Sequence, residues 1–270
     1  MTTILALDAA WTATEPSGVA LVTRDAARWR VVAAAPSYNS FLGLAEGTPI
    51  QWAAERFTGC DANVPKLLAA SAKLAGVEVD LVTIDMPVSL NAFTGRREAD
   101  NAISREFGSR GCAAHSPSVA RPGKLGESLS AAFRNAGYRV AGADTQVSTP
   151  RRLLEVYPHP ALLALLECSY RVQYKVSKST RYWPREPLRQ RIAYLLHEFA
   201  RIHEALHQAL GPIGVPLPAA DDVPSLNSLK RYEDVLDALV CAWVGVRYME
   251  GGARPLGDEA AAIWCPSSRA

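Results

Sequence analysis

Two short apolar segments of the chain end in an aspartate, and two further aspartates interrupt an apolar stretch near the C-terminus. The segments are residues 4–8, ILALD, and residues 81–85, LVTID, and the later pair is Asp234 and Asp237. Burying an ionised carboxylate without a cation costs several kcal/mol, so an aspartate that ends a buried strand is tolerated mainly where a ligand, a metal ion or water reaches it. The four side chains, Asp8, Asp85, Asp234 and Asp237, are therefore candidate ligands of a metal site.

Both segments lack the alternation of polar and apolar residues that a half-exposed strand shows. Uninterrupted apolar runs of this length are typical of strands that are buried on both faces of a sheet and covered by helices. Pro87 cannot donate a backbone hydrogen bond, so we expect the second strand to stop at Asp85. Ligands of open α/β sheets collect at the carboxyl ends of the strands, which is where Asp8 and Asp85 are expected to lie.

The stretch that carries Asp234 and Asp237 has the pattern of a buried helix. Residues 235–249 contain only two charged side chains, Asp237 and Arg247, and a helix that is apolar almost all round is expected to be buried. Two residues three positions apart lie on one side of a helix, where both can point at one ion. Asp234 also has a structural interpretation, because the helix macrodipole favours acidic residues in the first turn.

The remaining pattern predicts an α/β fold, a mixed sheet flanked by helices that begins with an antiparallel meander. Strands are predicted at residues 3–8, 18–22, 29–33, 81–85, 153–157 and 262–264, with a turn at Asp25 and Ala26. Helices are predicted at 96–107, 129–136, 187–210 and 229–249, and another starts near 48 or 62 and ends at 75, before Gly76. We expect a single domain over residues 1–270, with a helical and loop insertion at residues 91–150 after the fourth strand.

Composition places the chain among compact globular proteins. Its 270 residues are 49% hydrophobic, which is enough for a large core. The sequence has no run of about 18 uncharged apolar residues and no basic segment before the first strand, so we expect neither a membrane span nor a signal peptide, and therefore a cytoplasmic protein. Five widely spaced cysteines without a C-x-x-C pair argue against a disulfide framework and against a cysteine zinc site.

The net charge of +2 says little about partners, but the charge is unevenly distributed. Residues 94–191 contain 17 lysines and arginines against 8 acidic residues, whereas the remaining 12 basic and 19 acidic residues give the rest of the chain a charge of −7. The basic region is either a solvated surface or a region that binds phosphate groups beside an acidic catalytic core. Its candidate substrate-binding residues are Arg96, Arg97, His159, Lys175, Lys178 and Arg181.

Glu155 resembles the two strand-end aspartates, because it lies in the predicted strand 153–157. It precedes His159 by four residues. One interpretation makes Glu155 a further metal ligand or a group that orients one. The other makes it a structural acid paired with Arg151 or Arg152.

The order of three antiparallel strands followed by parallel strands and helices resembles the ribonuclease H-like fold. The chain is similar to the domain-of-unknown-function family 429, whose members are described as predicted nucleases of the ribonuclease H-like superfamily. The resemblance rests on the Asp8 strand and on five motifs, which are 84–87 (IDMP), 96–100 (RREAD), 155–160 (EVYPHP), 174–175 (YK) and 234–239 (DVLDAL). Together they span nearly the whole chain in order.

The resemblance implies a nuclease or phosphodiesterase that binds one or two Mg²⁺ or Mn²⁺ ions and hydrolyses nucleic-acid phosphodiester bonds. Asp8 would bridge the ions, Asp85 and Asp237 would complete their coordination, and Asp234 would assist. The implied partners are nucleic acid or a phosphorylated small molecule, no membrane partner is expected, and the oligomeric state stays open.

Two other classes of function stay open. Residues 203–207, HEALH, match the H-E-x-x-H pattern of zinc metalloproteases, in which His203 and His207 would bind zinc and Glu204 would act as the base. Against this interpretation, Gly211 falls one residue too late for the extended pattern, and no obvious third ligand follows. The third class is a ribonuclease H-like protein with altered catalysis that binds a nucleotide or another phosphorylated ligand.

Overall fold

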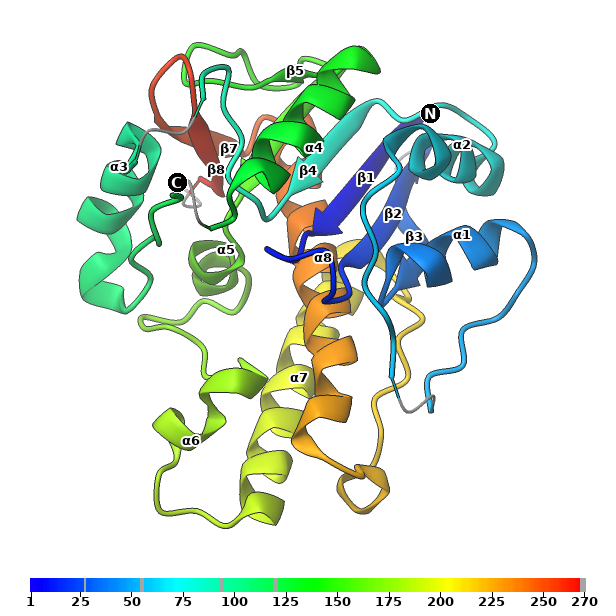
Figure 1. Ribbon diagram of the computed structural model, residues 1–270, viewed down its shortest axis with the longest axis vertical. Helices are drawn as coiled ribbons and strands as arrows, with labels where there is room; N and C mark the ends of the chain where they lie inside the picture. The colour runs from blue at the N-terminus through cyan, green and yellow to red at the C-terminus, as the bar shows by residue number, and fades with distance from the viewer. Residues whose placement is uncertain (27, 54–55, 93–94, 119–120, 268–270) are drawn as a thin grey trace.

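The structure is a computed structural model that describes residues 1–26, 28–53, 56–92, 95–118 and 121–267. One mixed sheet forms its centre, with the strand order β3-β2-β1-β4-β6-β8-β7 and with β5 paired beside β6. Helices cover both faces of this sheet (Figure 1). The predicted architecture is confirmed, because an antiparallel meander is followed by parallel strands, as in ribonuclease H-like proteins.

The strands fall into three groups. The meander consists of β1 (Thr2–Asp8), β2 (Gly18–Asp25) and β3 (Arg28–Ala35), which pair antiparallel. Parallel pairs join β1, β4 (Leu81–Ile84), β6 (Arg152–Val156) and β8 (Ala262–Pro266), and the short β5 (Arg139–Val140) is also parallel to β6. β7 (Ala253–Gly257) forms the edge and is antiparallel to β8. The sequence pattern does not predict β5, which is too short to show a period, or β7, in which Arg254 and Pro255 interrupt the apolar pattern.

The helices fall on the two faces of the sheet and in the segments between strands. The α-helices are α1 (Tyr38–Ala45), α2 (Val64–Ala75), α3 (Glu98–Phe107), α4 (Lys124–Asn135), α5 (Pro158–Leu165), α6 (Ser179–Tyr182), α7 (Leu188–Leu210) and α8 (Lys230–Met249). Short 3₁₀ helices add η1 (Gly108–Arg110), η2 (Val176–Lys178), η3 (Ala220–Asp222) and η4 (Leu226–Leu229). None of these described helices combines the length and the apolarity needed to cross a membrane.

Helix ends follow the capping residues. The predicted helix before Gly76 begins at residue 64, and not near 48, because Asn63 accepts the Lys66 backbone N–H at 3.1 Å and so caps it. The sequence pattern does not predict α1, which is short and contains Gly43, a poor helix former. Ser37 begins α1 by accepting a backbone N–H of the first turn at 3.0 Å.

Side chains of β1 alternate between two cores, one on each face of the sheet. Ile4 and Ala6 belong to the core that includes α7 and α8, whereas Leu5 and Leu7 belong to the core that includes α1, α2 and α4. All four side chains are fully buried, as the apolar run predicts. Successive residues of a strand point to opposite faces, so Asp8 continues the face of Ile4 and Ala6, toward α8.

Glycines at two points allow α8 to lie close against the sheet. A Cβ atom on Gly245 of α8 would lie 2.9 Å from Cγ2 of Thr83 in β4. A Cβ atom on Gly18, the first residue of β2, would lie 2.0 Å from the carbonyl oxygen of Asp234. Because Gly18 pairs with Asp8 in the ladder between β1 and β2, the first turns of α8 lie against the carboxyl end of β1.

We predict that Gly245→Ala destabilises the protein by about 1–3 kcal/mol, which is the usual cost of overpacking. The added methyl group would meet Thr83 and Ile4 at 2.9 and 3.0 Å, and both are β-branched side chains with few rotamers. Gly43→Ala in α1 is the matched control, because its Cβ meets only Thr48, at an ordinary 3.6 Å. Urea unfolding measures both variants, and equal stability of the two would contradict the close contact of α8.

Candidate active site

Asp8 and Asp85 lie beside each other at the carboxyl ends of two neighbouring parallel strands. Asp8 ends β1 and Asp85 follows β4, and the backbone N–H of Asp85 donates to the carbonyl of Leu7 at 2.9 Å. By strand alternation both side chains belong to the sheet face that α8 covers. The sequence prediction that two strands place their terminal aspartates at one edge of the sheet therefore agrees with the geometry.

α8 brings the other two aspartates to the same place. Asp234 and Asp237 lie in the first turns of α8 and are 2% and 0% exposed. Burial raises the pKa of Asp8 well above its ordinary value, and the nearby charges of Asp237 and Asp234 raise it further. The charge of Asp237 also acts on Asp85. The structure therefore brings together all four predicted aspartates, from β1, the end of β4 and α8.

Tyr174 and Lys175 hold Asp237. The Tyr174 hydroxyl donates to Oδ1 of Asp237 at 2.5 Å, and Nζ of Lys175 donates to Oδ2. Tyr174 is fully buried, and its ring lies 5.1 Å from the Lys175 ammonium group. Both oxygens of Asp237 therefore have donors, which makes this carboxylate the group that positions Lys175.

Lys230 and Glu233 complete the cluster, and the sequence pattern does not identify either of them. Nζ of Lys230 donates to Oε1 of Glu233 at 2.9 Å and to Oδ1 of Asp234. Burial acts to raise the pKa of Glu233, but the charges of Lys175 and Lys230 outweigh it and hold that pKa below its ordinary value. Charged residues are common in the first turn of any helix, so their sequence signal is weak.

The described cluster contains more carboxyl than ammonium groups. The carboxyl groups belong to Asp8, Asp85, Glu233, Asp234 and Asp237, and the ammonium groups belong to Lys175 and Lys230. Burial raises the pKa of Asp85 to about 7 and that of Asp234 to about 6. Oδ2 of Asp234 is buried and has no hydrogen-bond partner in the described part of the chain. This cluster is short of positive charge, which a proton or a cation can supply.

The chemistry of these donors fits a hard divalent cation, because Mg²⁺ and Mn²⁺ prefer carboxylate oxygens. Within the described residues, Asp8 and Asp85 form no salt bridge, whereas Asp234 and Asp237 are paired with lysines. As placed, no three histidine, cysteine, aspartate or glutamate side chains of the described residues form a group that holds an ion. In this arrangement the ammonium groups of Lys175 and Lys230 supply the positive charge that pairs with Asp237 and Asp234.

Glu155 does not join the four aspartates, although it lies near the same edge of the sheet. Arg97 donates to both of its oxygens, at 2.6 and 2.7 Å, and also donates to Asp100 at 2.7 Å. The backbone N–H of Val88 donates to Glu155 Oε2 at 2.9 Å. A carboxylate held this way on both oxygens is a structural group, and Arg97 is held with it.

Strand alternation explains why Glu155 lies apart. Its neighbours Leu154 and Val156 belong to the core that includes α8, so Glu155 points to the other face of β6. The predicted partners of Glu155, Arg151 and Arg152, are also wrong. Arg151 forms its ion pair with Glu78, and the arginine that pairs with Glu155 is Arg97.

The predicted substrate-binding residues separate into those that line a cavity beside Asp85 and those that do not. The cavity has a volume of about 180 Å³, and Arg97, His159 and Lys175 line it together with Asp85. The others lie outside it, with Arg96 bonded to Asn101, Ser104 and Ser116, and with Lys178 and Arg181 exposed.

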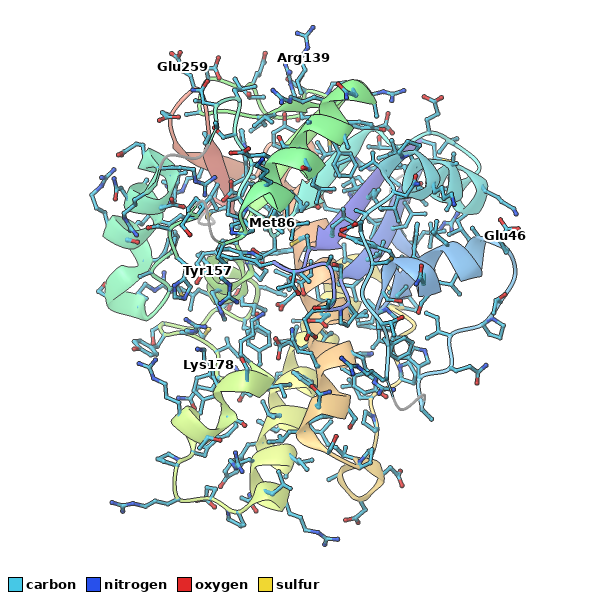
Figure 2. The ribbon with its side chains drawn as sticks, viewed as in Figure 1. Glu46, Met86, Arg139, Tyr157, Lys178 and Glu259 are labelled. Carbon is cyan, nitrogen blue, oxygen red and sulfur yellow. The ribbon has the colours of Figure 1, made fainter. Side chains whose placement is uncertain are left out.

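A second cavity lies on the other side of the turn that follows β4. Asp85 and Pro87 line the cavity of about 180 Å³, whereas Met86 lines the second cavity, of about 420 Å³. Tyr157, which lines the first cavity, and Met86 are both labelled in Figure 2 near the centre of the molecule. The loop after β1 contributes to both cavities, through Trp11 to the first and through its neighbours to the second.

The H-E-x-x-H motif gains no support from its surroundings. Nε2 of His203 lies 3.1 Å from the carbonyl oxygen of Val215, and His207 is exposed on α7. Neither histidine belongs to a metal-binding group in the described ranges of the chain. The H-E-x-x-H spacing fits an amphipathic helix, in which Ile202 and Leu206 are buried and the polar residues between them lie toward solvent.

The fold and the site define an α/β protein with a ribonuclease H-like sheet and an acidic cluster at the carboxyl ends of β1 and β4. The chain belongs to the family described as protein of unknown function (DUF429), whose model matches residues 16–262. The family predicted from the motifs is thereby confirmed. No curated protein and no solved structure matches the chain.

We predict that Asp85→Asn stabilises the metal-free protein at about pH 8 and raises its melting temperature by several degrees. The folded pKa of about 7 lies above the ordinary 3.8, so the contribution of Asp85 to stability is complete below the ordinary pKa and is lost as pH rises through about 7. The gain from asparagine should therefore shrink as pH is lowered below about 6.

Calorimetry in a chelating buffer over this pH range measures the effect of Asp85→Asn. Asp221→Asn is the control, because the Asp221 side chain is 90% exposed. A loss of stability in Asp85→Asn at every pH would contradict a half-buried carboxylate that is costly to ionise.

Proposed function

We propose that the protein is a divalent-metal-dependent phosphodiesterase that acts on nucleic acid. The observation that carries the proposal is the meeting of Asp8, Asp85, Asp234 and Asp237 in one cluster that its two lysines do not neutralise. Carboxylates from parallel strand ends and a facing helix are the donor set that Mg²⁺ or Mn²⁺ requires. A bound divalent ion stabilises charge on a phosphoryl oxygen and lowers the pKa of bound water.

The protein's own groups have separable roles in this proposal. Asp8, Asp85 and Asp234 would hold the ion. Among the described residues, Asp8 and Asp85 form no salt bridge, and Oδ2 of Asp234 has no hydrogen-bond partner. Asp237 would instead fix Lys175, whose ammonium group reaches the cavity wall beside Asp85. A fixed ammonium group there favours negatively charged substrate groups near the aspartates.

The paired lysines also favour a second candidate function. Lys175 and Lys230 neutralise Asp237 and Asp234. These ion pairs stabilise the two aspartates without a catalytic metal ion. In that case the chain binds a nucleotide or another phosphorylated ligand without hydrolysing it. The two functions differ in turnover, so one assay separates them.

We predict that Asp8→Asn lowers metal-dependent cleavage by roughly 100-fold or more, the effect expected when a group that stabilises the transition state is removed. The substrates are labelled single- and double-stranded DNA and RNA oligonucleotides, assayed with Mg²⁺ or Mn²⁺ and with a chelator. Asp221→Asn is again the control, because its exposed carboxylate lies outside the cluster.

Two results would contradict the proposed function. Cleavage that Asp8→Asn retains in full would place the activity elsewhere or in a contaminant. Absence of cleavage by the wild-type protein with either ion on every substrate would favour the binding function.

A further inference from the structure

Arg171 presents a guanidinium group in the cavity of about 180 Å³ and forms no salt bridge with a carboxylate of the described residues. Its Nη2 atom lies 2.6 Å from Nε2 of His159, and Nη1 donates to the carbonyl of Gly111 at 3.3 Å. Nε of Arg171 is buried and makes no hydrogen bond with the described residues. No described acidic side chain forms a salt bridge with this arginine, so its charge is available to a ligand that enters the cavity.

His159 offers a second unused donor in the same cavity. A guanidinium group can only donate, so Nε2 of His159 must accept from Arg171, and the ring proton must lie on Nδ1. Burial, with the charges of Lys175 and Arg171, holds the pKa of His159 well below its ordinary value and keeps the ring neutral. Nδ1 is nevertheless buried without a hydrogen-bond partner among the described residues, and the side chain is only 5% exposed.

The start of α5 adds a third feature that favours an anion. α5 begins at Pro158, its N-cap residue Tyr157 makes no side-chain capping bond, and its first turn has no acidic residue. The first backbone N–H groups of a helix carry partial positive charge and commonly bind anions. Pro158 and Pro160 have no N–H, so the His159 N–H is the donor that the first three residues of α5 offer. Tyr157, Pro158 and His159 all line the cavity, together with Arg171 and Lys175.

The acidic residues of the cavity do not cancel these donors. Glu155 and Asp100 are both bound by Arg97, which leaves Asp85 as the carboxylate that faces the ion site. The cavity therefore offers the donors of Arg171 and His159 and, at Asp85, a carboxylate that forms no salt bridge with the described residues.

We propose that this cavity is a phosphate-binding subsite, in which Arg171 and the Nδ1–H of His159, with the backbone N–H of His159 at the start of α5, bind a phosphate group of the substrate. A phosphate group has several acceptor oxygens that suit a guanidinium fork and further N–H donors. The volume of about 180 Å³ lies below the ~300 Å³ at which sites for drug-sized ligands begin, so it fits a phosphate group with a small organic part. The inference deepens the proposed function, because it places a substrate phosphate next to Asp85.

The first test measures binding of inorganic phosphate to the full chain by calorimetry in a chelating buffer. Arg171→Gln should weaken phosphate binding by roughly tenfold or more, as expected for the loss of a charge-assisted pair. Arg189→Gln on α7 is the matched control and should bind as the wild type does, because its side chain is 93% exposed. Absence of phosphate binding to the wild-type chain, or equal binding by both variants, would overturn the proposal.

The second test measures phosphate binding on the wild-type protein and uses a variant only to assign one resonance. In wild-type protein with ¹⁵N-labelled histidine, phosphate should shift the Nδ1–H resonance of His159, which is assigned by its loss in His159→Phe. An unchanged resonance at saturating phosphate would overturn the role of His159. Phenyl phosphate and benzoate then separate the anion classes, because tighter binding of benzoate would show a carboxylate site instead.

The outcome is distinguishable from that of the proposed function. Asp8→Asn should keep its phosphate binding in the chelating buffer, because Asp8 does not line this cavity. Phosphate binding without cleavage would leave the subsite standing while the nuclease proposal fails. Cleavage that Arg171→Gln leaves unchanged in KM and kcat would remove the subsite while the nuclease proposal stands.

Discussion

The site depends on the close contact between α8 and the antiparallel meander. Gly18 and Gly245 allow the helix backbone to approach β2 and β4, and this approach places Asp234 and Asp237 next to Asp8. The contact that fills the core therefore also forces several carboxylates into a buried environment, where each raises the free energy of ionising the next. Such an arrangement is costly for stability alone, and this cost is the reason for our proposal that the cluster binds a cation.

Lys175 links the acidic cluster to the cavity beside it. Its ammonium group binds Asp237 and also lies on the wall of the cavity that contains Arg171 and His159. Asp85 interacts with the acidic cluster and also lines the cavity that contains Arg171 and His159. Our two proposals therefore place a metal ion and a phosphate group next to each other, which is the pair of charges that a phosphodiester reaction brings together.

Local patterns made the aspartates predictable. The uninterrupted apolar runs before Asp8 and Asp85 identify buried strand ends, and the nearly uncharged stretch after Asp234 identifies the buried helix. Alternation within β6 also separates Glu155 from Asp8, but residues 153–157 are apolar on both faces, so their sequence does not show which face Glu155 takes. The fold class follows from the same runs, whereas α1 and β7 lack a clear period.

The partners of these carboxylates were not predictable, because they come from distant parts of the chain. Lys175 and Asp237 are 62 residues apart, and Arg97 and Glu155 are 58 apart, so no local spacing connects them. The absence of a salt bridge between Arg171 and the described acidic residues is likewise a tertiary property, since Glu167 lies four residues before it in sequence without pairing with it.

The most direct test of the central claim is a crystal structure of the protein soaked with Mn²⁺, with the ion located by its anomalous scattering. We predict a Mn²⁺ ion bound by carboxylate oxygens of Asp8, Asp85 and Asp234. A crystal saturated with Mn²⁺ that shows no ion among these aspartates, and that keeps both lysine pairs in place, would contradict the account.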